Sequence, residues 1–173
     1  MVGAGPTGYE TIALIAAGIG AITGVAALAW NVAEFRLTGP RVKGQLIFGA
    51  VGPGGIVSTR HGPPRDWKML ARQGFVEPLV GIEVVNSGRA STQVHHFSCR
   101  LSNGFALSDA QLSVNQPIPF VLEPHRSERF WLPAQEVKVL VESARGAGLP
   151  VKHLTMEVEI TGPKTVSTKS FTF

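Results

Sequence analysis

A long uncharged run near the start of the chain constrains this protein more than any other feature. The run extends from Thr11 to Ala33, between Glu10 and Glu34, and consists mainly of Ile, Leu, Val, Ala and Gly. A helix rises 1.5 Å per residue, so about 20 apolar residues cross the roughly 30 Å hydrocarbon core of a bilayer. The run therefore predicts a transmembrane helix over residues 11–35, with the lipid bilayer as its partner and a short tail (1–10) before it.

Two other structures are compatible with the same run. A buried core helix is one, but such helices rarely run this long without a polar face. A cleaved secretory signal is the other, because Ala27-Leu28-Ala29 offers a cleavage site before Trp30. Signal peptides begin with a basic segment, and Met1–Tyr9 contains neither Lys nor Arg. We favour the membrane anchor over both.

The distribution of basic residues predicts how the anchor is oriented. Arg36, Arg41 and Lys43 follow the apolar run, whereas no basic side chain precedes it. Basic flanks stay in the cytoplasm, so we expect the N-terminus outside the cell membrane and the C-terminal domain in the cytoplasm. The single cysteine, Cys99, agrees with this side, because one thiol cannot form an internal disulfide.

Two groups of residues in the helix are candidates for contacts within the membrane. Ala16, Gly20 and Gly24 form a stripe of small residues that predicts helix packing and a homo-oligomer. The alternative is that Gly and Ala are simply frequent in membrane helices. The residues expected at the membrane interface are the aromatic and basic ones at the two ends: Tyr9, Trp30, Phe35 and Arg36.

After a linker (36–40), the pattern changes to that of a β domain over residues 41–173. Alternating or β-branched runs predict strands at 41–51, 76–86, 92–101, 117–122, 128–132, 154–161 and 165–173. Asn103-Gly104 predicts a hairpin with a type I′ turn. From Pro133 the apolar spacing becomes helical, at Val137, Leu140, Val141 and Ala144, and a strand through Val137, Val139 and Val141 is the alternative.

These elements predict a mainly β fold: an antiparallel, immunoglobulin-like β-sandwich with one short crossover helix. Several short stretches carry a resemblance: Trp30, the run 36–43 (RLTGPRVK), 84–89 (VVNSGR), 122–124 (LEP) and 131–133 (WLP). In these stretches the chain resembles uncharacterised small bacterial single-pass membrane proteins. In that group a single helix precedes a Gly-Pro-Arg-Val strand and an immunoglobulin-like domain. The resemblance implies an architecture and no activity.

A basic insertion loop at 52–74 interrupts that pattern. Its candidate surface residues are one aromatic and five that are basic or histidine: Arg60, His61, Arg65, Trp67, Lys68 and Arg72. We expect a short helix over 66–73 with Trp67, Leu70 and Ala71 facing inward. The surface is suited to anionic headgroups or an acidic partner. The simpler interpretation, which we prefer, is a solvated loop whose aromatic residue packs on the domain.

No pattern of catalytic or ligand-binding residues is recognisable. Strict alternation places His96 with Val94 on one strand face and His95 with Phe97 and Cys99 on the other, so the two histidines cannot share a metal ion and no zinc site is expected. His95 and Cys99 share a face but lie about 13 Å apart at roughly 3.3 Å per residue, so no Cys–His pair is expected either. Glu83, Glu142, Glu157 and Glu159 occupy polar positions that predict solvated carboxylates. The net charge of +4, from 16 basic and 12 acidic residues, is too small for a nucleic-acid-binding surface.

The sequence therefore predicts a protein that is not an enzyme and that has no cofactor, metal or nucleic-acid partner. The hypothesis we prefer is a membrane-tethered protein-binding or scaffolding module with an unknown protein partner. An accessory subunit of a larger membrane complex and an exported, envelope-binding β-sandwich are the alternatives.

Overall fold

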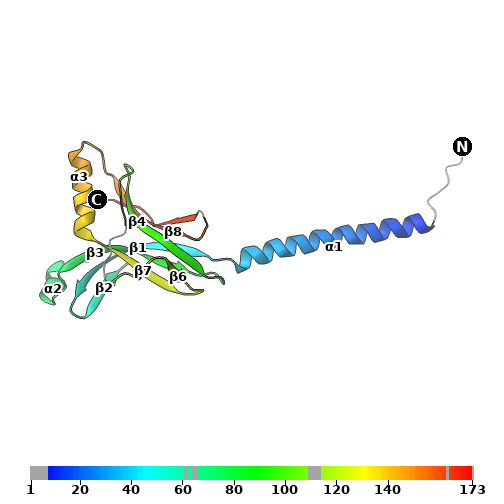
Figure 1. Cartoon of the computed structure of the whole chain (residues 1–173), viewed down its shortest axis with the longest axis horizontal. Coiled ribbons are helices and arrows are strands. Elements are labelled where there is room, and N and C mark those ends of the chain that lie inside the picture. Colours follow the sequence, from blue (N-terminus) through cyan, green and yellow to red (C-terminus); the bar gives the residue numbers. More distant parts are fainter. Residues whose placement is uncertain (1–7, 61, 64–65, 109–113, 163, 173) are drawn as a thin grey trace. The chain divides into compact units, whose positions relative to one another are not determined.

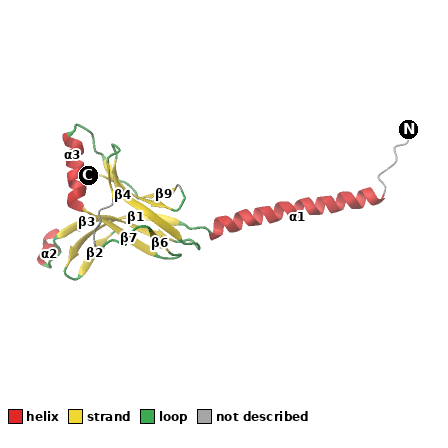
Figure 2. Cartoon of the chain, in the orientation of Figure 1, coloured by secondary structure: helices red, strands yellow, loops and turns green. Residues whose placement is uncertain are grey.

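The computed structural model describes residues 8–60, 62–63, 66–108, 114–162 and 164–172, without the side chains of Phe35, Arg36 and Trp67. The chain divides between Gly39 and Pro40 into two compact units. The first unit contains the long helix, and the second contains the strands and two shorter helices (Figures 1 and 2).

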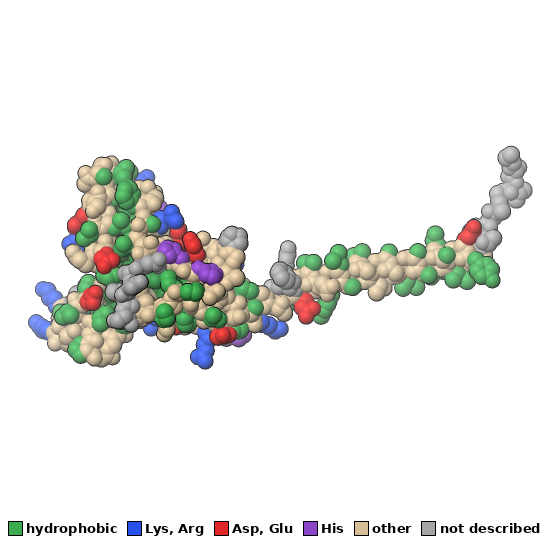
Figure 3. Space-filling model, viewed as in Figure 1, with side chains coloured by type: hydrophobic (Ala, Val, Ile, Leu, Met, Phe, Trp, Pro, Cys, Tyr) green, Lys and Arg blue, Asp and Glu red, His purple; other side chains and the backbone are tan. Residues whose placement is uncertain are grey.

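The first unit is the helix α1, Gly8–Thr38. Its segment Gly8–Glu34 has a mean hydropathy of 2.2 and is long and apolar enough to cross a membrane, a test that a signal sequence also passes. None of that segment is buried, which contradicts the alternative of a core helix. Figure 3 shows apolar side chains along it. The hydroxyl of Thr23 donates to the carbonyl of Ile19 at 2.8 Å, so this polar group is satisfied within the helix.

Two antiparallel sheets form the second unit, which confirms the mainly β prediction. The first has the order β2-β1-β3-β7, where β1 is Val42–Gly52, β2 Gly55–Thr59, β3 Glu77–Asn86 and β7 Ser127–Pro133. In the second, β8 (His153–Ile160) pairs with β4 (Thr92–Leu101). On its other side, β8 pairs with β9 (Lys164–Ser167) and β10 (Phe171–Thr172). On its other side, β4 pairs with β5 (Ala106–Ser108) and β6 (Phe120–Leu122).

The hydrophobic core lies between the two sheets. Alternate residues of β3, namely Val80, Ile82 and Val84, point into it, as the strand pattern predicts. Phe130 of β7 meets Phe97 of β4 across the core, with ring centroids 5.2 Å apart. Burial of these apolar side chains from both sheets holds the sheets face to face.

The predicted faces of β4 are wrong in its first half. The pairing of β4 with β8 shifts register between Val94 and His96, which is a β-bulge. The additional residue lets Val94 face the same core as Phe97 and Cys99, all of them buried. Strict alternation cannot anticipate this change of face, because a bulge leaves no alternating pattern of its own.

The Asn103-Gly104 hairpin forms, but its turn differs from the predicted type. β4 and β5 pair as expected, and the N–H of Gly104 donates to the carbonyl of Leu101 at 2.9 Å. Gly104 has φ of +93°, whereas Asn103 is not among the described residues with positive φ. A type I′ turn needs positive φ at both positions, so this loop is a turn closed by a glycine in the left-handed region.

The predicted helix after β7 is confirmed as α3, Ala134–Gly146, and the alternative strand is excluded. Pro133 precedes its first turn, and Val137, Val141 and Ala144 are buried on one face. The expected last strand is divided into β9 and β10, because the chain leaves the ladder at residues 168–170.

The insertion contains more structure than a loop. The run Gly55–Thr59 forms β2, which pairs with β1 in register Gly52↔Gly55 to Phe48↔Thr59. The short helix α2 spans Trp67–Arg72, and the Asp66 side chain accepts from the N–H of Met69. Leu70 is buried as expected, but Ala71 is exposed, so the predicted inward face is only partly correct.

Candidate functional site

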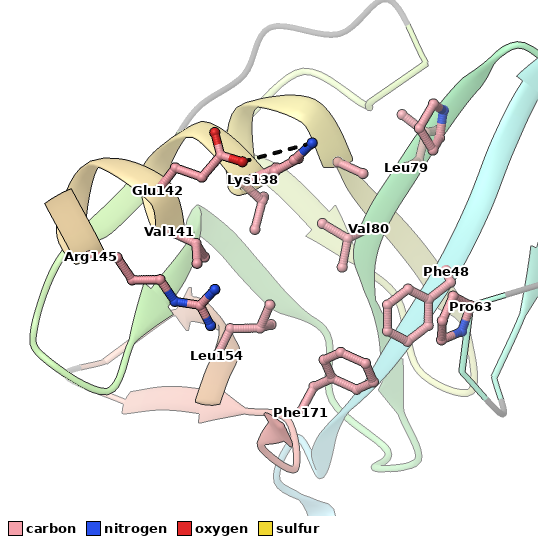
Figure 4. Close-up of a pocket in the computed structure, with 13 residues that line it drawn as sticks. Phe48, Pro63, Leu79, Val80, Lys138, Val141, Glu142, Arg145, Leu154 and Phe171 are labelled. Atoms are coloured by element: carbon pink, nitrogen blue, oxygen red, sulfur yellow. Dashed lines mark ion pairs between the residues drawn. The ribbon is translucent and has the colours of Figure 1, made fainter. Parts of the chain in front are cut away.

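An apolar pocket lies beneath α3 (Figure 4). Its volume is about 320 Å³, and its walls come from α3, both sheets and the segment before α2. The apolar side chains drawn in Figure 4 that form these walls include Phe48, Leu79, Val80, Val141, Leu154 and Phe171. Apolar pockets of this size hold a small ligand or one or two large side chains of a partner.

Charged side chains of α3 form one side of the pocket. Lys138 and Glu142 are one turn apart and form an ion pair of 3.8 Å, with both side chains well exposed. Arg145 extends from the same helix toward Leu154 (Figure 4). The exposed Lys138–Glu142 pair adds little to stability. Its place at the mouth suits recognition of polar groups that flank an apolar side chain.

A second, more polar groove adjoins the pocket. It has a volume of about 680 Å³ and lies between β1, from Lys43 to Phe48, and the chain segment 169–171. Phe48 and Phe171 line both the pocket and the groove. Their rings meet edge to face with centroids 5.1 Å apart, so one aromatic pair forms the boundary between the two cavities.

The groove follows a part of β1 that β2 does not cover. β2 pairs only with residues 48–52 of β1, whereas β3 pairs with residues 42–51. Among the described residues, the first half of β1 therefore pairs with β3 alone. An edge of this kind presents backbone N–H and C=O groups to whatever occupies the groove.

A buried carboxylate lies on the outer face of the first sheet, next to this groove. Glu83 has only 2% of its side chain exposed and accepts two hydrogen bonds from Arg60, at 2.7 and 3.0 Å. Arg129 donates from Nε to Glu83 at 3.1 Å and from Nη1 to Ser58 at 3.3 Å. The predicted solvated carboxylate is wrong at this position, because β2 brings Arg60 across the sheet.

The ion pairs set the protonation state of this cluster. The hydrogen bonds from Arg60 lower the pKa of Glu83, although burial of the carboxyl acts in the opposite direction. The same contact raises the pKa of Arg60. Two guanidinium groups share one carboxylate, so the cluster keeps an excess positive charge at its exposed side.

The residues of the predicted basic surface do not form one described patch. Arg60 lines the groove and pairs with Glu83. Lys68 and Arg72 are exposed on α2. The side chain of Trp67 and the whole of His61 and Arg65 lie outside the described residues.

The residues proposed for membrane contacts all lie on α1. Ala16, Gly20 and Gly24 are exposed on the helix, and a Cβ added at either glycine would meet nothing within 4 Å. Tyr9 and Trp30 are also exposed, at 88% and 71%. The side chains of Phe35 and Arg36 lie outside the described part of the helix.

The cysteine and histidine residues form no reactive arrangement in the described part of the chain. Cys99 is buried in the core, and this burial, with a smaller contribution from Glu157, raises the pKa of its thiol to about 12. Among the described residues, no group of three or more His, Cys, Asp or Glu is placed to hold a metal ion. The cavities beside α3 and β1 are the candidate site.

No model of a known protein family matches the chain, and no curated protein or solved structure was found to match it.

Neither the pocket nor the Glu83 cluster was predicted from the sequence. Both bring together residues that are far apart in the chain, such as Phe48 with Phe171 and Arg60 with Glu83. One local signal was present for the second case: Ile56 and Val57 within the glycine-rich insertion are typical of a strand. A hairpin there would have placed Arg60 beside β1.

Proposed function

We propose that this protein is a membrane-tethered module that binds a protein partner through the pocket beneath α3 and the adjoining groove of β1. The observation that carries the proposal is the apolar pocket with Lys138, Glu142 and Arg145 along one side. A partner with an apolar side chain between polar groups matches that arrangement. In this proposal the protein binds its partner without catalysing a reaction.

The proposed tether is α1, with the N-terminus outside and the β domain in the cytoplasm. Support comes from its apolar length and from the basic residues Arg41 and Lys43, which follow the helix. We also propose self-association through Ala16, Gly20 and Gly24. A reporter fused after Phe173 tests the orientation: cytoplasmic activity supports it, and activity only outside the membrane contradicts it.

We further propose that the β domain belongs to the immunoglobulin-like class of sandwiches. Without the β2 hairpin, the strand orders become β1-β3-β7 in one sheet and β9-β8-β4-β6 in the other. If β1, β3, β4, β7, β8 and β9 are lettered A, B, C, E, F and G, the two sheets have the orders A-B-E and G-F-C, as in immunoglobulin domains. β6 is then an additional strand beside C.

Photo-crosslinking in intact membranes tests the binding function. A benzophenone amino acid replaces Lys138 at the pocket mouth, and the matched control carries it at Lys152, an exposed position that does not line the pocket. We expect a discrete protein adduct from position 138 and none from position 152. The proposal fails if position 138 gives no adduct or gives only the adducts of the control.

One observation favours a second candidate, an exported protein that binds envelope material. Ala27-Leu28-Ala29 is a cleavage site of the signal-peptide type, and its position would release the chain at Trp30. The continuous helix α1 extends beyond this site to Thr38, and its apolar segment is longer than the usual signal core. N-terminal sequencing of the protein isolated from cells distinguishes the two: a start at Trp30 establishes export, and an intact α1 establishes the anchor.

A further inference from the structure

We propose that the groove beside β1 accepts an extended, acidic segment of the partner as an additional strand of the first sheet. The inference rests on the proposed protein-binding function and adds to it the backbone conformation and the charge of the segment that binds. Three independent features of the groove support it: an unpaired strand edge, the space along that edge, and the charges that line it.

The edge of β1 has hydrogen-bonding groups directed into the groove. The carbonyls of Arg41 and Val51 accept from Ser87 and Val76, so odd-numbered residues of β1 direct their N–H and C=O groups toward β3. Alternate residues of an antiparallel strand direct these groups to opposite sides. The even-numbered residues Val42, Gly44 and Leu46 therefore direct their backbone N–H and C=O groups to the opposite edge of β1, beyond the end of β2.

Nothing in the described part of the chain takes the place of β2 along this stretch. The described hydrogen bonds join neither Gly44 nor Leu46 to a residue on the open side. β1 also has a smooth extended course here, in continuous register with β3 from Val42 to Val51. An added strand would continue the first sheet in the position that β2 occupies further along.

The groove provides the space that a strand needs. Its lining comes from β1 between Lys43 and Phe48, from Val85 of β3, from Arg60 and Gly62 after β2, and from residues 169–171. Neighbouring strands in a sheet lie about 4.8 Å apart, so a peptide at that distance from β1 lies inside the groove. Phe48 and Phe171 form its boundary with the apolar pocket, so the pocket lies next to the groove and can receive a side chain of the same segment.

The charges of the groove select an acidic segment. Lys43, Arg60 and Lys169 line it, and none of its described lining residues is acidic. Arg60 keeps its position because it is bonded to the buried Glu83. Lysines at an open edge oppose pairing with a second copy of the same edge, because like charges would then meet. The same lysines attract glutamate or aspartate side chains of a different strand.

A peptide titration of the full chain in phosphatidylcholine nanodiscs tests the proposal. The probe is a fluorescent peptide of about eight residues with alternating Glu and Val, the length of a short strand. Its control has Lys in place of Glu. By fluorescence anisotropy we expect the acidic peptide to bind at least about tenfold more tightly than the basic one.

Charge reversal in the groove provides the matched variants. The double variant Lys43→Glu with Lys169→Glu should weaken acidic-peptide binding by at least about tenfold and favour the basic peptide. The control pair, Lys68→Glu with Lys152→Glu, changes the same net charge at exposed positions outside the groove and should leave binding within about twofold. Equal weakening by both pairs contradicts the proposal, because it would indicate attraction by net charge alone.

Backbone pairing has its own measurement. Alternate residues of a strand direct their N–H groups to opposite edges, so two peptides are made, each N-methylated at one of the two sets of alternate residues. The peptide that loses the N–H groups facing β1 should not bind, and the other should bind as the parent peptide does. Bound peptide should also slow hydrogen exchange in residues 42–47 of β1. Equal binding of both methylated forms, or unchanged exchange in β1, overturns strand addition.

The result also separates this inference from the function on which it rests. If the acidic peptide does not bind but position 138 still gives a specific protein adduct, the protein-binding function stands and strand addition is wrong. If groove reversal instead reduces binding to phosphatidylglycerol vesicles without affecting the peptide, the groove binds anionic headgroups and the proposed partner is wrong.

Discussion

The rings of Phe48 and Phe171 are 5.1 Å apart at their centroids, and this contact separates the apolar pocket from the charged groove. Phe48 belongs to β1 and Phe171 to β10, so the pair also connects the two sheets. One aromatic contact thus shapes both cavities of the candidate site.

A double-mutant cycle measures that contact. Phe48→Ala, Phe171→Ala and the double variant should show a coupling of about 1 kcal/mol in the free energy of unfolding, as expected for an edge-to-face pair. Urea denaturation of the full chain in detergent, followed by tryptophan fluorescence, provides the three differences. Additive effects would show that the two rings do not stabilise each other.

Glu83 predicts a specific dependence of stability on pH. Arg60 lowers the pKa of Glu83 in the folded protein, whereas in the unfolded chain the pKa is about 4.3. The stabilisation is therefore complete above the unfolded value and is lost as the pH falls through the lower, folded value. We expect Glu83→Gln to reduce the free energy of unfolding by about 2 kcal/mol at pH 7, and by much less at strongly acidic pH.

The matched control for this measurement is Glu123→Gln, an exposed glutamate in the turn before β7. Its effect should stay within about 0.5 kcal/mol at either pH. A Glu83→Gln variant as stable as the wild type at pH 7 would contradict the role assigned to the cluster.

Gly81 should tolerate no side chain. A Cβ at this position would lie 2.7 Å from Cε3 of Trp131, whose ring covers Gly81 and Gly49 on the outer face of the sheet, and it would also meet the carbonyl of Phe130. We expect Gly81→Ala to destabilise the domain by about 2 kcal/mol. Gly146→Ala is the control, because nothing lies within 4 Å of its added Cβ and alanine favours the helix. Equal stability of the two variants would contradict this expectation, because it would show that the Trp131 ring makes room for the added methyl group at no cost in free energy.

Cys99 should be unreactive in the folded protein. Its thiol is buried, with a pKa of about 12, so almost no thiolate forms at pH 8. We expect iodoacetamide to modify the native chain more than about a hundredfold more slowly than the chain in urea, as measured by mass spectrometry. Rapid modification of the native chain would show that the core opens around β4.

Elements with a local signal were predictable from the sequence. The apolar run predicted α1, alternation predicted β3, and the change to helical spacing after Pro133 predicted α3. The bulge in β4 was not predictable, since it depends on how β4 pairs with β8. The glycine- and proline-rich residues 52–55 and the charged residues after β2 are typical of a loop, so the strand between them was not predicted.

The candidate site was predictable only in fragments. The sequence identified Arg60 as part of a basic surface, but only the sheet register shows that it meets Glu83 and faces the groove. Within the described residues, β1 has an open edge because β2 pairs only with residues 48–52 of β1, whereas β3 pairs with residues 42–51. Such a difference in strand length depends on pairing between distant segments, which alternation within one segment does not reveal.

The most direct test of the account fills the pocket and measures the adduct formed at position 138. Ala134→Phe places a large side chain among the pocket residues, and Ala147→Phe makes the same change at an exposed position outside the pocket. The account predicts that Ala134→Phe reduces the adduct in intact membranes by at least about fivefold, while Ala147→Phe and the unfolding midpoints stay close to the parent. Unchanged adduct formation with the pocket filled would contradict the claim that the pocket beneath α3 binds the partner.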